Sequence, residues 1–295
     1  MSLIENSLEK LRRASASAKE PGAAAVSLPT AVRAESVATL EPRPAHKRIA
    51  VNFDHLRVAG YLPEQGQERR FADYCHRIKR PLIDRALGAG SAPDARLIML
   101  SSALPGDGKT FITLNLALSM ARERDISMLL VDGDLPKAQI TRVLDLPDEP
   151  GLLDALRDDR LDVESLIFDT DLPNLEILPA GRPAEGAAEL IASARMRDIA
   201  TRLLTRNPRR LVLFDSAPLL VSSEARALAP IPGQIVLVAR AGHTPRRAIT
   251  DAIAQVDRKK LQGLVLNDAY LGPAHGYYDY GYGELPGTAS KSGAR

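Results

Sequence analysis

Short apolar runs alternate with longer segments of helical periodicity from residue 96 onward. The apolar runs lie at 97–100, 128–131, 175–178, 211–214, 235–239 and 264–266. None shows the alternation of polar and apolar residues that marks a one-sided sheet, so we expect strands that are buried on both faces. Helical stretches at 109–123, 185–206 and 244–260 separate them. This alternation predicts an α/β fold, a mostly parallel sheet with helices on both faces.

The first and last parts of the chain have a different pattern. Residues 1–13 could form a short amphipathic helix, and residues rich in Ala, Ser and Pro follow without any aromatic side chain before Phe53. A basic helical segment over 66–86 contains Pro81, which is expected to kink or split it. The predicted parts are a short helix and flexible linker at 1–47, a catalytic domain at 48–270 and a flexible tyrosine-rich tail at 271–295.

Composition narrows the class of protein without naming a function. The 295 residues are 45% hydrophobic and 26% charged, as in a soluble globular protein. The 39 basic and 37 acidic residues nearly cancel, which argues against broad nucleic-acid binding. No apolar run approaches the roughly 18 residues of a membrane-spanning helix, and the charged N-terminus is unlike a signal peptide. Cys75 is the one cysteine, so an internal disulfide is excluded and the reducing cytosol is the expected compartment.

The strongest chemical signal is the loop at 103–110, which follows one predicted strand and opens a helix. It matches the phosphate-binding pattern G-x-x-x-x-G-K-[ST], except that Ala103 replaces the first glycine. Backbone N–H groups of Gly106, Asp107 and Gly108 are expected to cradle phosphates at the positive end of that helix. Lys109 can then neutralise the phosphates, and the Thr110 hydroxyl can bind Mg²⁺. A glycine turn that happens to precede Lys-Thr is the alternative.

Aspartates follow two further apolar runs. Asp132 and Asp134 come after the run at 128–131, and Asp215 comes after the run at 211–214. Ligands of open α/β sheets bind outside the carboxyl ends of the strands. A single aspartate there is usually a helix cap, but three such aspartates in one chain favour a metal and nucleotide site.

Tyrosines concentrate at the end of the chain instead of spreading through a core. Five of the seven lie in the last 26 residues, at Tyr270, Tyr277, Tyr278, Tyr280 and Tyr282. A Gly-Tyr tail with a binding or stacking role is the alternative to a tail that is modified.

Together, the loop 103–110, Asp132-x-Asp134 and Asp215-x-x-Pro218 resemble the Walker A, A′ and B motifs of bacterial tyrosine kinases, a P-loop NTPase-like family. With the tyrosine tail, the chain is most similar to the autokinases associated with exosortase and exopolysaccharide gene clusters. The resemblance implies an ATP- and Mg²⁺-dependent protein-tyrosine kinase. It would phosphorylate its own tail at Tyr277, Tyr278, Tyr280 and Tyr282 and regulate exopolysaccharide polymerisation or export.

The predicted site residues fall into three groups. The catalytic group is Lys109, Asp132 and Asp134, with Asp132 as the acceptor or orienter of the tyrosine proton by resemblance. The nucleotide-binding group is Pro105, Gly106, Asp107, Gly108, Lys109, Thr110, Phe111 and Asn267. The metal group is Thr110, Asp134 and Asp215. The sequence does not settle which of Asp132 and Asp134 is base and which is metal ligand, and Asn267 is equally explained as a turn residue.

The resemblance implies two partners, a separate transmembrane chain-length regulator and further copies of the chain. It also allows a cognate tyrosine phosphatase. No nucleic acid is expected as a partner. The chain would be cytoplasmic and peripheral at the inner membrane through its partner. A cargo- or site-positioning ATPase of the chromosome-partition or septum-placement type is the alternative. Those ATPases carry a second lysine where this chain has Leu104.

The basic segment contains Arg69, Arg70, Arg77, Lys79 and Arg80. A solvated helix face, a subunit contact and attraction to membrane phospholipid are the three interpretations. In the family, an oligomerisation helix often shows E-x-x-R-x-x-R. Arg77 and Arg80 fit its two arginines, and Tyr74 stands in place of the glutamate.

Overall fold

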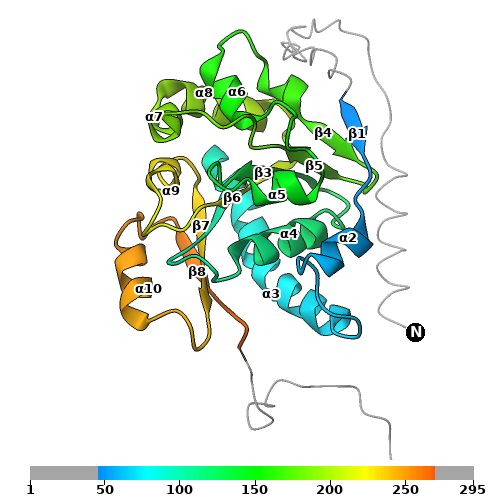
Figure 1. The fold of residues 1–295 in the computed structure, drawn as a ribbon, viewed down its shortest axis with the longest axis vertical. Coiled ribbons are helices and arrows are strands. Elements are labelled where there is room, and N and C mark those ends of the chain that lie inside the picture. Colours follow the sequence, from blue (N-terminus) through cyan, green and yellow to red (C-terminus); the bar gives the residue numbers. More distant parts are fainter. Residues whose placement is uncertain (1–45, 270–295) are drawn as a thin grey trace, which may run out of the picture. The chain divides into compact units, whose positions relative to one another are not determined.

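The computed structural model describes residues 46–269, which contain an eight-stranded sheet (Figure 1). The strands are β1 (Lys47–Ile49), β2 (Leu97–Ser102), β3 (Ser127–Gly133), β4 (Phe168–Thr170), β5 (Leu175–Leu178), β6 (Arg210–Ser216), β7 (Gln234–Arg240) and β8 (Leu261–Asn267). Their spatial order is β1-β4-β5-β3-β6-β2-β7-β8. Every neighbouring pair is parallel except β4 and β5. The predicted mostly parallel sheet is confirmed.

Helices connect the successive strands, except between β4 and β5, which follow one another directly. The helices are α2 (Phe53–Val58), α3 (Glu68–Leu87), α4 (Lys109–Met120), α5 (Gln139–Val143), α6 (Leu152–Arg157), α7 (Ala187–Ala192), α8 (Ala194–Arg206), α9 (Ser223–Leu228) and α10 (Arg246–Ile253), with 3-10 turns at Pro93–Arg96 and Val163–Leu166. Among the described residues, no helix is both long and apolar enough to span a membrane. The predicted N-terminal helix and the tyrosine tail lie outside the described residues.

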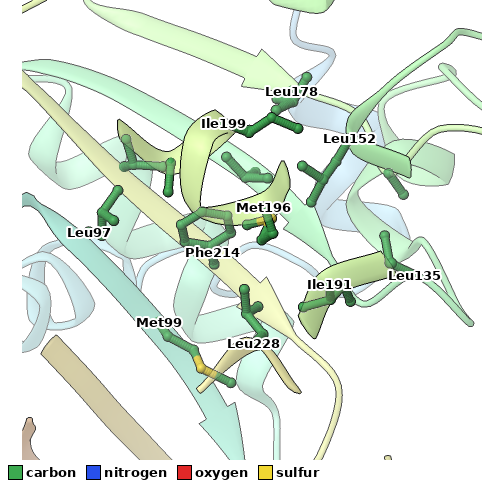
Figure 2. Close-up of a cluster of buried hydrophobic side chains, with 14 of the residues drawn as sticks. Leu97, Met99, Leu135, Leu152, Leu178, Ile191, Met196, Ile199, Phe214 and Leu228 are labelled. Atoms are coloured by element: carbon green, nitrogen blue, oxygen red, sulfur yellow. The ribbon is translucent and has the colours of Figure 1, made fainter. Parts of the chain in front are cut away.

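Two hydrophobic cores lie on opposite faces of the sheet, and successive residues of each central strand enter opposite cores. In β2, Leu97 and Met99 join one core while Ile98 and Leu100 join the other. The first core is closed by α6 to α9, with Phe214 among Met196 and other side chains (Figure 2). The second is closed by α2 to α5. Because both faces of the strands need apolar partners, the runs in the sequence show no polar alternation.

One predicted strand differs from this pattern. β8 lies at the end of the sheet and pairs only with β7. Leu264 and Leu266 are 49% and 55% exposed, so the prediction that the run at 264–266 is buried on both faces is wrong. The apolar run could not reveal this, because edge position is set by the order of strands and not by the residues of the strand.

Two helices also differ from their predicted form. The segment 185–206 is two helices, since Ser193 is extended and its N–H and hydroxyl both bond the Leu190 carbonyl. In contrast, α3 continues through Pro81 without a break. Pro81 is exposed, so its ring is accommodated on the solvent side of the helix. Within α3, Lys79 is buried and pairs with Glu123 at 2.8 Å, so it is not part of the solvated basic face.

A buried ion triad ties β6 to β5 and to the turn at Val163–Leu166. The guanidinium of Arg210 is 1% exposed and contacts both carboxylate oxygens of Glu164, at 2.5 and 3.1 Å. It also donates to Glu176 at 3.2 Å and to the Leu203 carbonyl. The fold therefore encloses two carboxylates that share the charge of the buried Arg210 guanidinium.

Replacing that cation should destabilise the protein strongly. We expect Arg210→Met to lower the free energy of unfolding by about 3–5 kcal/mol, because two buried carboxylates lose their ion pairs with Arg210. Chemical denaturation monitored by circular dichroism measures the change. Arg202→Met is the matched control, because Arg202 pairs with Asp162 in an exposed contact and should cost less than about 1 kcal/mol. Equal costs for the two variants would contradict the role assigned to the triad.

Candidate functional site

The loop between β2 and α4 has the backbone geometry of an anion cradle. Gly106 and Gly108 have φ of +86° and +88°, in the left-handed region that favours glycine. Gly108 also needs its missing side chain, because a Cβ there would lie 2.0 Å from the Asn267 amide nitrogen. The loop leads directly into α4, so its N–H groups and the helix N-terminus are positioned for phosphate.

Side chains from distant segments hold this loop in shape. The Asp107 carboxylate accepts from the Leu104 N–H at 3.0 Å and from the Thr244 hydroxyl at 2.6 Å. Asn267, at the end of β8, donates its amide to the Asp107 carbonyl at 3.1 Å. Asp107 and Asn267 are thus loop supports in this structure, and contact of Asn267 with adenine stays a prediction.

Lys109 is 7% exposed and forms an ion pair with Asp134 at 2.6 Å. Its ammonium also donates to the Thr110 hydroxyl at 3.3 Å. Burial opposes the charged form, but the carboxylates of Asp215 and Asp134 outweigh it and raise the pKa of Lys109. The lysine is therefore positively charged at neutral pH, as neutralisation of phosphate requires.

Asp215 ends β6 and is held by two threonines of α4. Thr110 donates to one carboxylate oxygen at 2.8 Å, and Thr113 donates to the other at 2.9 Å. The Thr110 hydroxyl also lies 3.1 Å from Gln139 Oε1. Complete burial raises the pKa of Asp215 against the opposing effects of Lys109 and the two hydroxyls. Thr110 and Asp215, which the sequence assigned to one metal, therefore lie in direct contact.

Asp132 lies opposite Asp215 in the pairing of β3 with β6. One of its oxygens accepts from the Thr141 N–H at 2.8 Å and from the Thr141 hydroxyl at 2.7 Å. The other oxygen, Oδ1, is buried without a hydrogen-bond partner within the part of the chain that the structure describes. Burial, and next the charge of Asp215, raises the pKa of Asp132 to about 7.

The structure thus brings together the loop, Lys109, Thr110 and all three predicted aspartates. It also adds residues that the sequence motifs did not single out, namely Thr113, Gln139, Thr141 and Thr244. Thr113 could have been found, since it follows Lys109 by one helical turn. Thr141 and Thr244 reach the site from segments that carry no recognisable motif.

The residues present fit a nucleotide with a divalent cation. Three carboxylates and one threonine hydroxyl supply the oxygen ligands that Mg²⁺ prefers, and a buried carboxylate oxygen of Asp132 has no donor among the described residues. A single buried lysine faces these three carboxylates, so the cluster favours additional positive charge. The two left-handed glycines leave the loop backbone open to phosphate oxygens.

No protein-family model matches the chain, but curated proteins do. Tyrosine-protein kinase wzc of Salmonella typhimurium is 29% identical over 192 residues, 64% of this chain and 26% of that protein. Tyrosine-protein kinase YwqD of Bacillus subtilis is 28% identical over 188 residues, 63% of this chain and 76% of that protein. Succinoglycan biosynthesis transport protein ExoP of Rhizobium meliloti is 30% identical over 206 residues, 65% of this chain and 24% of that protein. The chain spans about a quarter of the length of wzc and ExoP.

Solved structures agree with these relatives. The VpsO kinase domain is 28% identical with a TM-score of 0.57, covering 70% of this chain and all (100%) of that one. The chimerical protein CapA2B2 has the same fold, with a TM-score of 0.58 at 24% identity, over 76% of this chain and 93% of that one. The resemblance to bacterial tyrosine kinases and the P-loop NTPase-like fold are confirmed. The chain is related in sequence and fold to bacterial tyrosine-protein kinases.

The raised pKa of Asp132 predicts a pH-dependent stability. The folded protein holds this proton more tightly than the unfolded chain, so ionisation between about pH 4 and pH 7 lowers stability as the pH rises. We therefore expect the Tm of Asp132→Asn, compared with the Tm of wild type, to be higher at pH 8 than at pH 5. Thermal unfolding without nucleotide and with a chelator measures both differences. Each kcal/mol corresponds to about 2–4 °C. The exposed Asp251→Asn is the control, and an equal pH dependence for both variants would contradict the shift.

Proposed function

We propose that the chain is an ATP- and Mg²⁺-dependent protein-tyrosine autokinase that phosphorylates its own C-terminal tyrosines. The observation that carries the proposal is the joint burial of Lys109, Thr110, Asp134 and Asp215 at the phosphate loop. Relatives named tyrosine-protein kinases support the reaction type. The acceptors are Tyr277, Tyr278, Tyr280 and Tyr282, which lie outside the described residues.

The phosphate loop and its lysine bind the nucleotide. Backbone N–H groups of Gly106, Asp107 and Gly108 bind phosphate oxygens. Pro105 and Phe111 flank this segment in the sequence, and the Phe111 ring packs against Phe71. Lys109 exchanges its contact with Asp134 for one with the phosphates, which neutralises charge that develops during transfer. The exchange needs little movement, because Lys109 opens the helix that ends the loop.

Thr110, Asp134 and Asp215 hold the cation. Mg²⁺ supplies charge neutralisation at the transferred phosphoryl group when it is bound. Release of Asp134 from Lys109 frees a carboxylate for this role, and Thr113 keeps the Asp215 carboxylate in a fixed orientation. Lys109 therefore neutralises the phosphates, and the cation neutralises the carboxylates that hold it.

Asp132 accepts or orients the proton of the tyrosine. A pKa near 7 suits a group that takes a proton at neutral pH, and Thr141 occupies only one of its two oxygens. Asp132 is fully buried in the described arrangement, so a tyrosine reaches it only after a local rearrangement of the site.

The wider role is regulation of exopolysaccharide polymerisation or export. The names of relatives support it, since ExoP is a succinoglycan biosynthesis transport protein. The chain would act as a cytoplasmic homo-oligomer, peripheral at the inner membrane through a separate transmembrane chain-length regulator. A cognate tyrosine phosphatase would reset it.

Removing the loop lysine should abolish the activity. We expect Lys109→Met to lower phosphotyrosine formation by at least about 100-fold, because the phosphates lose their buried cation. Mass spectrometry of the purified chain with and without ATP·Mg²⁺ measures it. Lys259→Met, on the surface, is the control, and thermal unfolding checks the fold because Lys109 is the counter-ion of Asp134. Wild-type phosphorylation in Lys109→Met would reject this site, whereas ATP hydrolysis without phosphotyrosine in wild type would favour a positioning ATPase.

The aspartates should respond differently to metal. Asp134→Asn and Asp215→Asn weaken metal binding, so higher Mg²⁺ or Mn²⁺ should restore part of their lost activity. Asp132→Asn removes a proton acceptor and should not recover. Initial rates of phosphotyrosine formation across a metal titration test this division. Equal recovery of all three variants would show that Asp132 is a metal ligand as well.

A further inference from the structure

Tyr74 lies on the exposed part of α3 between two arginines. Its side chain is 36% exposed, and its hydroxyl accepts a hydrogen bond from Arg70 Nε at 3.0 Å. The Arg70 guanidinium also lies 5.9 Å from the centre of the tyrosine ring. Arg77 is exposed one turn further along the helix. Arg70 precedes Tyr74 by four residues and Arg77 follows it by three, so both lie beside it on the helix surface.

These two arginines have no acidic partner in the part of the chain that the structure describes. Among residues 46–269, neither Arg70 nor Arg77 forms an ion pair, whereas Arg80 of the same helix pairs with Asp84. Arg70 already contacts the hydroxyl, and Arg77 lies one helical turn further along the same face. Arginine matches the oxygens of a phosphate monoester with two parallel donors. The helix therefore presents a tyrosine hydroxyl with two arginines beside it on the same face.

The other described tyrosine provides a contrast. Tyr61 is half-buried against the second core, and its carbonyl is held by Asn115 at 2.8 Å. Burial, with the charge of Asp215, raises the pKa of the Tyr61 phenol. No arginine contact to its hydroxyl is present within the described chain. Access and counter-charge therefore single out Tyr74.

We propose that Tyr74 is a phosphorylation site in the folded domain and that Arg70 and Arg77 bind its phosphate. The proposal rests on the proposed kinase activity. In the step, the Tyr74 oxygen forms a bond to the terminal phosphorus of ATP. The bond from that phosphorus to the β–γ bridging oxygen breaks, ADP leaves, and the phenol proton passes to a carboxylate of the active site.

The active site that performs this step belongs to a second copy of the chain. Tyr74 is a fixed member of a 20-residue helix, with its side chain on the exposed face, and cannot swing into the phosphate loop of its own chain. On that helix, the neighbouring Phe71 packs against Phe111 with ring centres 5.0 Å apart, which anchors α3 to α4. A neighbouring copy must therefore approach the exposed face of α3.

Mapping of phosphosites tests the acceptor. The full chain is incubated with ATP·Mg²⁺, and we expect phosphate on Tyr74 and on the tail but none on Tyr61. In a mixture of Lys109→Met chains with active Tyr74→Phe chains, phosphate should appear on Tyr74 of the inactive chains. Tail phosphate without phosphate on Tyr74 would overturn this inference and leave the proposed kinase intact. Absence of all phosphotyrosine would overturn both.

The binding of the Tyr74 phosphate by Arg70 and Arg77, which we call the arginine clamp, is tested without the kinase reaction. Phosphotyrosine is incorporated genetically at position 74 of the full chain carrying Lys109→Met, and thermal unfolding is measured before and after phosphatase treatment. We expect the phosphate to raise Tm by about 2–4 °C and the combined Arg70→Gln and Arg77→Gln changes to remove that rise.

A charge-matched control separates the clamp from a general effect of charge. Arg69→Gln with Arg80→Gln removes two arginines that lie roughly 120–140° around the helix from Tyr74, so the rise should persist. No rise in the parent chain, or the same loss in both double variants, would overturn the clamp.

Discussion

The charge balance at the carboxyl ends of β2, β3 and β6 is the constraint on which the site depends. Within the described residues, Lys109 is the buried cation at this end of the sheet and faces Asp132, Asp134 and Asp215. One positive charge cannot balance three ionised carboxylates out of water, so burial and mutual repulsion favour retention of a proton in the cluster. Burial, and next the charge of Asp215, therefore raises the pKa of Asp132.

Sheet order creates this cluster, and the two cores hold it. β3, β6 and β2 are adjacent and parallel, so the residues that follow them meet at one edge. Both faces of these strands are buried, which leaves their carboxyl ends as the place where polar groups can gather. Gly133 permits close approach of the strands, because a Cβ there would lie 2.9 Å from the Asp215 carbonyl.

Local chemistry made much of this predictable. Continuous apolar runs identified the six longer strands, and the glycines before Lys109 identified the loop, because each feature is encoded by neighbouring residues. The exposed leucines of β8 depend on the order of strands in the sheet, which is set by segments distant in sequence. The same holds for Thr141 and Thr244, whose contacts with the site arise only when the chain folds.

The basic helix shows how such distant neighbours change the meaning of a sequence. In the sequence, the arginines and the lysine of α3 form one charged segment. In the structure, Lys79 points inward and contacts the Ser119 carbonyl and Glu123, near the end of α4. Near its start, α4 receives the ring of Phe71 against Phe111. Helix α3 is thus fastened to both ends of the helix that begins with Lys109. A phosphate on its outer face would therefore act on an element in direct contact with the phosphate-loop helix.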